Sequence, residues 1–219
     1  MRERLKPTRV ILLVAMVAGA LTMMFPFLWM LITSITPEGS LAGGPSLVVE
    51  HPTLEAYRSL GSTLPMARII VNSLLVAVTS TLLQLLTGSM AAYAFARLDF
   101  IGKNIMFALY LATMMVPLQV LVVPLFIMFK DLHLHDTYFA LIAPTVASAF
   151  GAFMLRQAVQ AVPRELDEAA TIDGAGHLRI FTRIILPLIT PSLATVGILA
   201  FMATWNSFLW PLVVIRSPE

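Results

Sequence analysis

The chain alternates between long apolar runs and shorter polar segments. Five runs are nearly free of charge and are close to the roughly 20 residues that an α-helix needs to cross a bilayer. They cover residues 10–32, 69–96, 105–129, 138–155 and 193–215. The pattern predicts an all-α, multi-spanning membrane protein whose residues 1–219 form a single transmembrane domain.

Composition supports this prediction and excludes some chemistry. Hydrophobic residues make up 58% of the 219 residues and charged residues 12%, whereas a typical soluble domain has about 25% charged residues. The chain has no cysteine, which excludes disulfides, thiolate catalysis and cysteine-ligated metals.

The charged residues indicate an orientation. With a cytoplasmic N-terminus, ten basic residues fall on the inner side, and the positive-inside rule is satisfied. These ten are Arg2, Arg4, Lys6, Arg9, Arg97, Lys103, Arg156, Arg164, Arg179 and Arg183, against Arg58, Arg68, Lys130 and Arg216 outside. We therefore expect the segment between the last two spans to face the cytoplasm.

Prolines and polar residues occur inside the predicted spans. Pro117 and Pro124 predict a kink in span 105–129, with the freed carbonyls satisfied by neighbours or water. The polar residues are Asn72, Gln84, Gln119 and Asn206. Such groups tend to face protein or a water-filled path, and interhelical hydrogen bonding explains each as well as solute contact does.

Trp205 lies directly before the polar residue Asn206. An indole can stack on a sugar face and an amide can bind hydroxyls, so Trp205 and Asn206 are the preferred pathway pair, with Gln119 and Asn72 as further candidates. Trp210, near the outer end of its span, fits an interfacial anchor.

A hydrophilic island from 168 to 187 separates the last two apolar runs. Pro163 suits the first position of a helix, and Glu165, Asp167 and Glu168 place negative charge near its N-terminus. Gly174 then permits a turn and the close approach of another protein surface. A second helix is expected from residue 175 to 187.

The residue types of this island carry a resemblance. Glu168, Ala169 and Ala170 are followed by Asp173 and Gly174, and then by Ile184, Leu186 and Pro187. This pattern resembles the EAA loop of the permease subunits of ATP-binding-cassette importers, which docks on the ATPase subunit. The resemblance implies that these eight residues couple the permease to ATP hydrolysis, with Glu168 able to pair with an arginine of the partner.

Three further stretches resemble the second permease subunit of carbohydrate importers of the maltose-transporter type. They are AAYAFARLDFIGK (91–103), MMVPLQVLVVPLF (114–126) and WNSFLWPLVV (205–214). The resemblance implies uptake of a sugar or related polyhydroxylated solute across a bacterial plasma membrane. Members usually have a sixth helix, and none follows the fifth run here, so we expect the chain to be part of a longer subunit.

No phosphate-binding GxxxxGK[ST] loop occurs in the chain, so it does not bind ATP by that route. The resemblance implies two ATPase subunits that carry ATP and magnesium, a second permease subunit and an extracytoplasmic solute-binding protein. Segment 36–68 is either the contact for that binding protein or a simple connector. No cofactor, metal or nucleic acid is expected on this chain. The His133, His135 and Asp136 group fits a hydrated turn better than a metal site.

Two other classes of protein fit less well. A secondary carrier driven by an ion gradient would need charged groups within its spans, and the five predicted spans contain none. A membrane-embedded enzyme would need a catalytic cluster, and the chain is expected not to be an enzyme. Within the importer class, a glycerol phosphodiester or an amino sugar remains an alternative solute.

Overall fold

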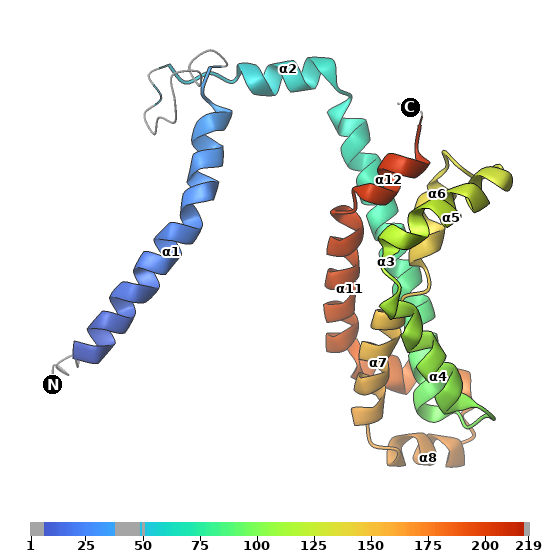
Figure 1. Ribbon diagram of the computed structural model, residues 1–219. Coiled ribbons are helices and arrows are strands. Elements are labelled where there is room, and N and C mark those ends of the chain that lie inside the picture. The colour runs from blue at the N-terminus through green and yellow to red at the C-terminus, as the bar shows by residue number, and fades with distance from the viewer. Residues whose placement is uncertain (1–6, 38–48, 50, 217–219) are drawn as a thin grey trace. The chain divides into compact units, whose positions relative to one another are not determined.

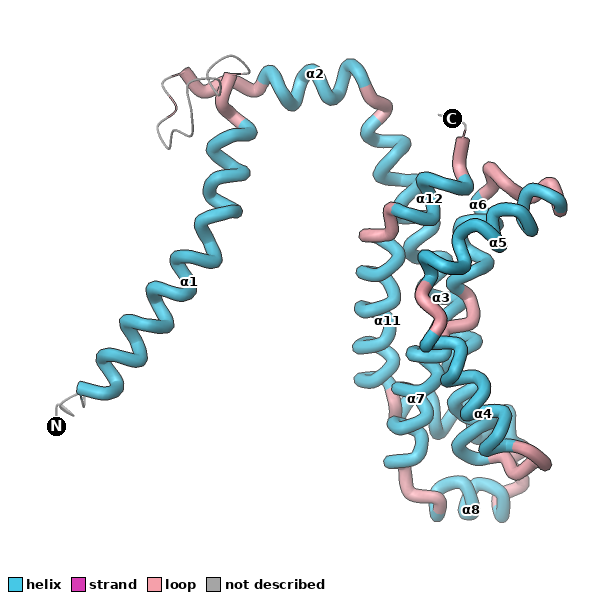
Figure 2. Tube along the Cα trace, viewed as in Figure 1, coloured by secondary structure: helices cyan, strands magenta, loops and turns pink. Residues whose placement is uncertain are grey.

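The computed structural model describes residues 7–37, 49 and 51–216, and all regular structure within them is helical, which confirms the predicted fold class. Figure 1 shows the elements in chain order, and Figure 2 shows the helices and the connections between them. The chain divides into two compact units, Met1–Ile69 and Ile70–Glu219, and each is described by itself.

The first unit contains a long helix and a short one. Helix α1 (Pro7–Ser34) includes the apolar run 10–32, and its large apolar side chains are exposed, as lipid-facing side chains would be. Helix α2 (Glu55–Thr63) lies in the polar segment after it. The hydroxyl of Thr53 accepts the amide N–H of Glu55 at 3.2 Å. Residues 38–48 and 50 of segment 36–68 lie outside the described part.

The second unit is a set of helices beside α3 (Met66–Arg97), which continues into it from the first unit. The others are α4 (Lys103–Ala112), η2 (Thr113–Met115), α5 (Leu118–Asp131), α6 (Tyr138–Ile142), η3 (Ala143–Thr145), α7 (Ala149–Ala161), α8 (Glu165–Ile172), α9 (His177–Ile180), η4 (Phe181–Ile185), α10 (Leu186–Leu188), α11 (Thr190–Trp205) and α12 (Leu209–Val214). Helices α3, α4, α7 and α11 form the bundle (Figure 1).

Only α1 and α3 are, among the described helices, long and apolar enough to cross a membrane alone. Three further pairs reach that length only when two helices bent against each other are taken together. The bends are 97° between Lys103–Met115 and Leu118–Asp131, 45° between Tyr138–Thr145 and Ala149–Ala161, and 78° between His177–Leu188 and Thr190–Trp205. The runs 105–129 and 138–155 are therefore bent within their length, whereas the run 193–215 is divided between α11 and α12.

Proline chemistry explains the sharpest bend. Val116, directly before Pro117, is extended, as the proline ring requires of the residue before it. Pro117 is extended as well and precedes α5, so the helix breaks here rather than kinking. Helix α5 continues through Pro124, so only one of the two predicted proline sites interrupts the helix.

One side chain from α3 and one local helix cap satisfy polar groups at the second bend. The Thr87 hydroxyl donates to the carbonyl of Val146 at 2.5 Å, within the segment between η3 and α7. Helix α7 is capped by Ser148, whose hydroxyl accepts the amide N–H of Gly151 at 3.2 Å. The break is thus stabilised by a helix more than fifty residues away in the chain.

Two clusters of buried residues lie at opposite ends of the second unit. One joins α3, α7, α9, η4 and α11 and includes Tyr93, Leu155, Phe181 and Ile185. The other joins α5, α6 and α12 through Phe129, Ala140, Trp210 and Val214. Helix α8 lies at the end of the first cluster (Figure 1).

The interpretation of Trp210 as an interfacial anchor is wrong. Its side chain is 3% exposed, its ring lies 5.8 Å from that of Phe129, and its Nε1–H donates to the carbonyl of Ala140 at 2.9 Å. The residue is a core residue because helix α12 turns back against α5 and α6. The order of residues along an apolar run does not show that the chain turns back at α12.

Replacing Trp210 by phenylalanine should destabilise the fold by about 1–3 kcal/mol, because the buried carbonyl of Ala140 loses its donor. Thermal unfolding of the detergent-solubilised protein, followed by circular dichroism, measures this loss. Trp205→Phe is the matched control, since Trp205 is exposed. Equal transition temperatures for the two variants would contradict the assigned role of the Trp210 hydrogen bond.

Candidate functional site

Helix α8 connects the end of α7 to α9 and lies across the end of the bundle (Figure 1). Its first turn contains Glu165, Asp167 and Glu168, whose charges complement the helix dipole as predicted. The helix begins at Glu165 rather than at Pro163, because the first helical carbonyl is that of Arg164, which accepts the amide N–H groups of Asp167 and Glu168 at 2.9 and 3.1 Å. The predicted helix start is therefore two residues too early.

The turn after α8 is a Schellman motif centred on Gly174. Gly174 has φ +79°, in the left-handed region that glycine adopts at least cost. The N–H of Ala175 donates to the carbonyl of Ala170 at 2.9 Å, and that of Gly174 donates to Thr171 at 3.0 Å, which are the two bonds of the motif. The spacing between the alanine and the glycine is thus set by the way the helix ends.

The eight predicted coupling residues fall into three groups. Glu168, Ala169, Asp173 and Gly174 are exposed along α8 and its turn. Ala170 instead packs with Ala175 against the nearby core cluster.

The remaining three, Ile184, Leu186 and Pro187, lie on the return path, where η4 is a π-helix. The chain bends before α11, and the Thr190 hydroxyl donates to the carbonyl of Pro187 at 2.8 Å. Ile184 and Leu186 are half-buried there, so this group shapes the bend rather than the exposed helix.

Two exposed apolar residues on this loop were not predicted. Ile172 is 86% exposed and Leu178 75% exposed, on either side of the Gly174 turn. His177, Arg179 and Arg183 lie close by around a shallow cavity at the turn. Large apolar side chains within a hydrophilic island were the available sequence signal. We define the coupling surface as Glu168, Ala169, Ile172, Asp173, Gly174 and Leu178.

A partly buried ion pair connects α8 to α3. Arg97 is the last residue of α3, and its side chain is 6% exposed. Its Nε lies 2.7 Å from Oδ2 of Asp167, whose side chain is 18% exposed, although the N–H direction does not meet the geometry of a hydrogen bond. Its Nη2 donates to the carbonyl of Val162 at 2.6 Å.

Two more contacts fix α3 at this end. The Arg156 Nε–H donates to the carbonyl of Phe95 at 3.2 Å, and its guanidinium carbon lies 4.2 Å from the centre of the Phe107 ring, a cation–π arrangement. The Tyr93 hydroxyl lies 3.4 Å from Nδ1 of His177. Helix α7 and the first residue of α9, which lie on either side of α8, therefore both contact α3.

Basic residues concentrate at the α8 end of the unit. Lys103, Arg156 and Arg164 surround one cavity, and Arg179 and Arg183 surround another. Arg216 lies at the other end, with its guanidinium carbon 5.5 Å from the Phe126 ring centre. This asymmetry agrees with the charge count that predicted a cytoplasmic loop.

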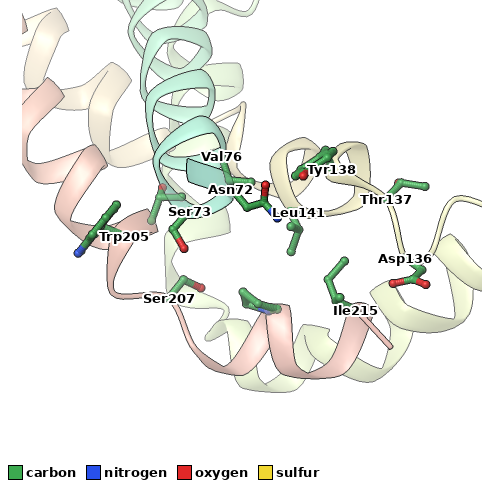
Figure 3. Close-up of a pocket in the computed structure, with 12 residues that line it drawn as sticks. Asn72, Ser73, Val76, Asp136, Thr137, Tyr138, Leu141, Trp205, Ser207 and Ile215 are labelled. Atoms are coloured by element: carbon green, nitrogen blue, oxygen red, sulfur yellow. The ribbon is translucent and has the colours of Figure 1, made fainter. Parts of the chain in front are cut away.

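A cavity of about 310 Å³ lies at the other end, near α12 (Figure 3). Asn72 and Ser73 of α3 face it from one side and Ser207 from the opposite side, while Trp205 lies at one edge (Figure 3). An adjoining cavity of about 330 Å³ includes Gln84 and shares Val76, Leu141, Thr204, Ser207 and Pro211. Hydroxyl, amide, carboxylate and indole groups thus line two adjoining cavities beside α3.

The structure brings together only two of the four predicted pathway residues. Asn72 and Trp205 line the same cavity, whereas Asn206 and Gln119 do not. The Asn206 amide donates to the carbonyl of Met202 in its own helix, at 2.7 Å. Among the described residues, no group of three His, Cys, Asp or Glu side chains could hold a metal ion.

The sequence matches a family of transport-system components and individual members of known transport systems. Residues 84–219 match the family described as "Binding-protein-dependent transport system inner membrane component". The chain is 43% identical over 148 residues to the arabinooligosaccharides transport system permease protein AraQ of Halalkalibacterium halodurans, covering 68% of this chain and 53% of the relative. It is 34% identical over 201 residues to the lactose transport system permease protein LacG of Rhizobium radiobacter, covering 92% and 73%.

A solved structure has the same fold. It is a crystal structure of a bacterial ABC transporter involved in the import of the acidic polysaccharide alginate, with a TM-score of 0.76 and 23% identity over 95% of this chain and 74% of that chain. The chain spans about half the length of AraQ, the first of these relatives. The family match covers most of this chain and includes the coupling loop, so the chain belongs to the family of inner membrane components of binding-protein-dependent transport systems.

Proposed function

We propose that this chain is the permease subunit of an ATP-binding-cassette importer for a sugar or related polyhydroxylated solute. The observation that carries the proposal is the coupling loop, an exposed acidic helix ended by a glycine turn and tied to a long apolar helix. The family match includes this loop. Similarity to permeases named for arabinooligosaccharides and lactose supports a carbohydrate as the solute.

The proposed transporter contains further subunits that bind ATP, complete the path and deliver the solute. Two ATPase subunits would bind ATP and magnesium, a second permease subunit would complete the path, and an extracytoplasmic solute-binding protein would deliver the solute. The basic residues at the α8 end favour a cytoplasmic position for the loop. The N-terminus would then be cytoplasmic in a single transmembrane domain of the bacterial plasma membrane.

The coupling surface would enter a groove on an ATPase subunit. Ile172 and Leu178 supply exposed apolar area, and Glu168 supplies a carboxylate for an arginine of the partner. When the ATPase dimer closes, α8 would move with it, and the bundle would switch between inward-facing and outward-facing arrangements. No step of this cycle makes or breaks a covalent bond on this chain.

The cavity near α12 is the proposed solute contact. The Trp205 ring is half-exposed at its edge, and Asn72, Ser73 and Ser207 offer hydrogen-bonding groups. An aromatic face beside amide and hydroxyl groups suits a polyhydroxylated ring, because sugars expose both C–H faces and hydroxyls. The other importer solutes, a glycerol phosphodiester or an amino sugar, would bind the same kinds of group.

Co-purification and transport test the proposed function together. A tagged, full-length subunit expressed with its neighbouring transport proteins should retain an ATPase subunit in detergent. In proteoliposomes, the complex should import a labelled sugar only with ATP and the solute-binding protein present. Import driven by an ion gradient alone, or a subunit purified without any ATPase, would contradict the proposal.

Alanine at Gly174 should reduce import several-fold while leaving the subunit in the membrane, because an L-residue at this φ costs roughly 1–2 kcal/mol. Asparagine, which tolerates the left-handed region, should reduce it less. Gly176→Ala is the matched control, since Gly176 has φ −77° and, like Gly174, open space around it. Wild-type import per ATP hydrolysed in both Gly174 variants would argue against the docking assignment.

Leucine at Trp205 should raise the KM for import about threefold to tenfold, because a stacked ring contributes about 0.5–1.5 kcal/mol. Initial uptake rates over a range of loaded binding protein measure this change. Phe208→Leu is the control, since Phe208 is exposed in the same connection and does not line the cavity. An equal KM in both variants would remove Trp205 from the proposed pathway.

A further inference from the structure

Helix α8 is held by little besides the Arg97 contact. None of its eight residues is buried, and its ends continue into the connection after α7 and the Gly174 turn. Ala170 makes its contact with the core through a single methyl group. A displacement of α8 could therefore be absorbed by its two flanking connections unless another contact transmits it to the bundle.

Arg97 is that contact. Its guanidinium meets Asp167 in the first turn of α8 and the carbonyl of Val162 at the end of α7. Both the ion pair and the hydrogen bond are largely excluded from solvent, with Arg97 6% exposed. The ion pair and the hydrogen bond together join the ends of α3 and α7 to the start of α8. Removing one partner of this partly buried pair would leave the other charge without its counter-charge.

The helix that ends at Arg97 is also a continuous connection to the solute cavity, and it is longer than α11 (Thr190–Trp205), the other unbroken helix that reaches the cavity. Two other apolar segments of the described second unit are broken within their length, by 97° and 45°. Helix α3 is unbroken from Met66 to Arg97, and Asn72 and Ser73 near its other end line the cavity. Twenty-five residues separate Asn72 from Arg97, or about 37 Å of helix.

We propose that Arg97 is the positioning residue through which movement of the coupling helix reaches α3, and that α3 transmits it as a rigid rod to the solute cavity. The inference rests on the proposed function and adds to it a specific residue pair, Arg97 and Asp167, and a specific helix. It assigns the pair a role in coupling rather than in solute binding, since neither residue lines the solute cavity.

The test uses the complete transporter in proteoliposomes, with ATP hydrolysis and solute import measured on the same vesicles. Arg97→Gln and Asp167→Asn should each retain the ATPase subunit and hydrolyse ATP but import at least tenfold less solute per ATP. The double variant should be no worse than Arg97→Gln, because both changes remove the same link. The control Arg164→Gln alters an exposed arginine of the same loop and should import as wild type.

A covalent replacement of the link separates coupling from folding. The chain has no cysteine, so Arg97→Cys with Asp167→Cys gives one reactive pair, which a short bifunctional thiol reagent can join through a reducible bond. Cross-linking should restore import per ATP, and reduction should abolish it again. If the Arg97→Gln subunit does not assemble with its partner subunits, the Asp167→Asn variant and the cross-linked cysteine pair still test the proposal.

The outcomes distinguish the two proposals. A wild-type subunit that never retains an ATPase overturns the proposed function. A wild type that couples, together with Arg97 and Asp167 variants that import normally per ATP, overturns the rod proposal alone. A cross-linked pair that forms but stays uncoupled also overturns it, since the link would then be present without its effect.

Discussion

The structure depends on the need of each helix-end carbonyl for a partner where water is scarce. Broken and short helices produce many such ends, and side chains from other helices donate to four carbonyls at or near helix ends. Thr87 donates to Val146, Arg97 to Val162, Arg156 to Phe95, and Trp210 to Ala140. Three of these bonds join other segments to α3, and the fourth joins α12 to α6.

The two ends of α3 have different surroundings. At one end of α3, the coupling loop is exposed and its acidic helix is held by an ion pair. Near the other end, amide and hydroxyl groups line a cavity beside an indole ring. The bent helices between them can change their angles, whereas an unbroken helix preserves its length.

The Schellman motif gives the sequence pattern of the loop a physical basis. Ala170 and Gly174 are four residues apart because they are the third-from-last helical residue and the left-handed residue that ends the helix. Ala170 is small because it packs on the core, while Glu168 and Ala169 face outward. One short motif therefore specifies both how the helix ends and which of its faces is free for a partner.

The sequence alone determined the elements whose cause is local. Apolar length predicted α1 and α3, the prolines predicted a kink where the helix breaks at Pro117, and the acids and Gly174 predicted a helix followed by a turn. The sequence alone did not determine which residues far apart in the chain contact each other. Three features each join residues 70 or more positions apart in the chain. They are the Arg97 and Asp167 pair, the hydrogen bond that buries Trp210 against Ala140, and the cavity that Asn72 and Trp205 share. Only tertiary packing decided these, because a side chain's partner depends on how bent helices turn back, and no local pattern records that angle.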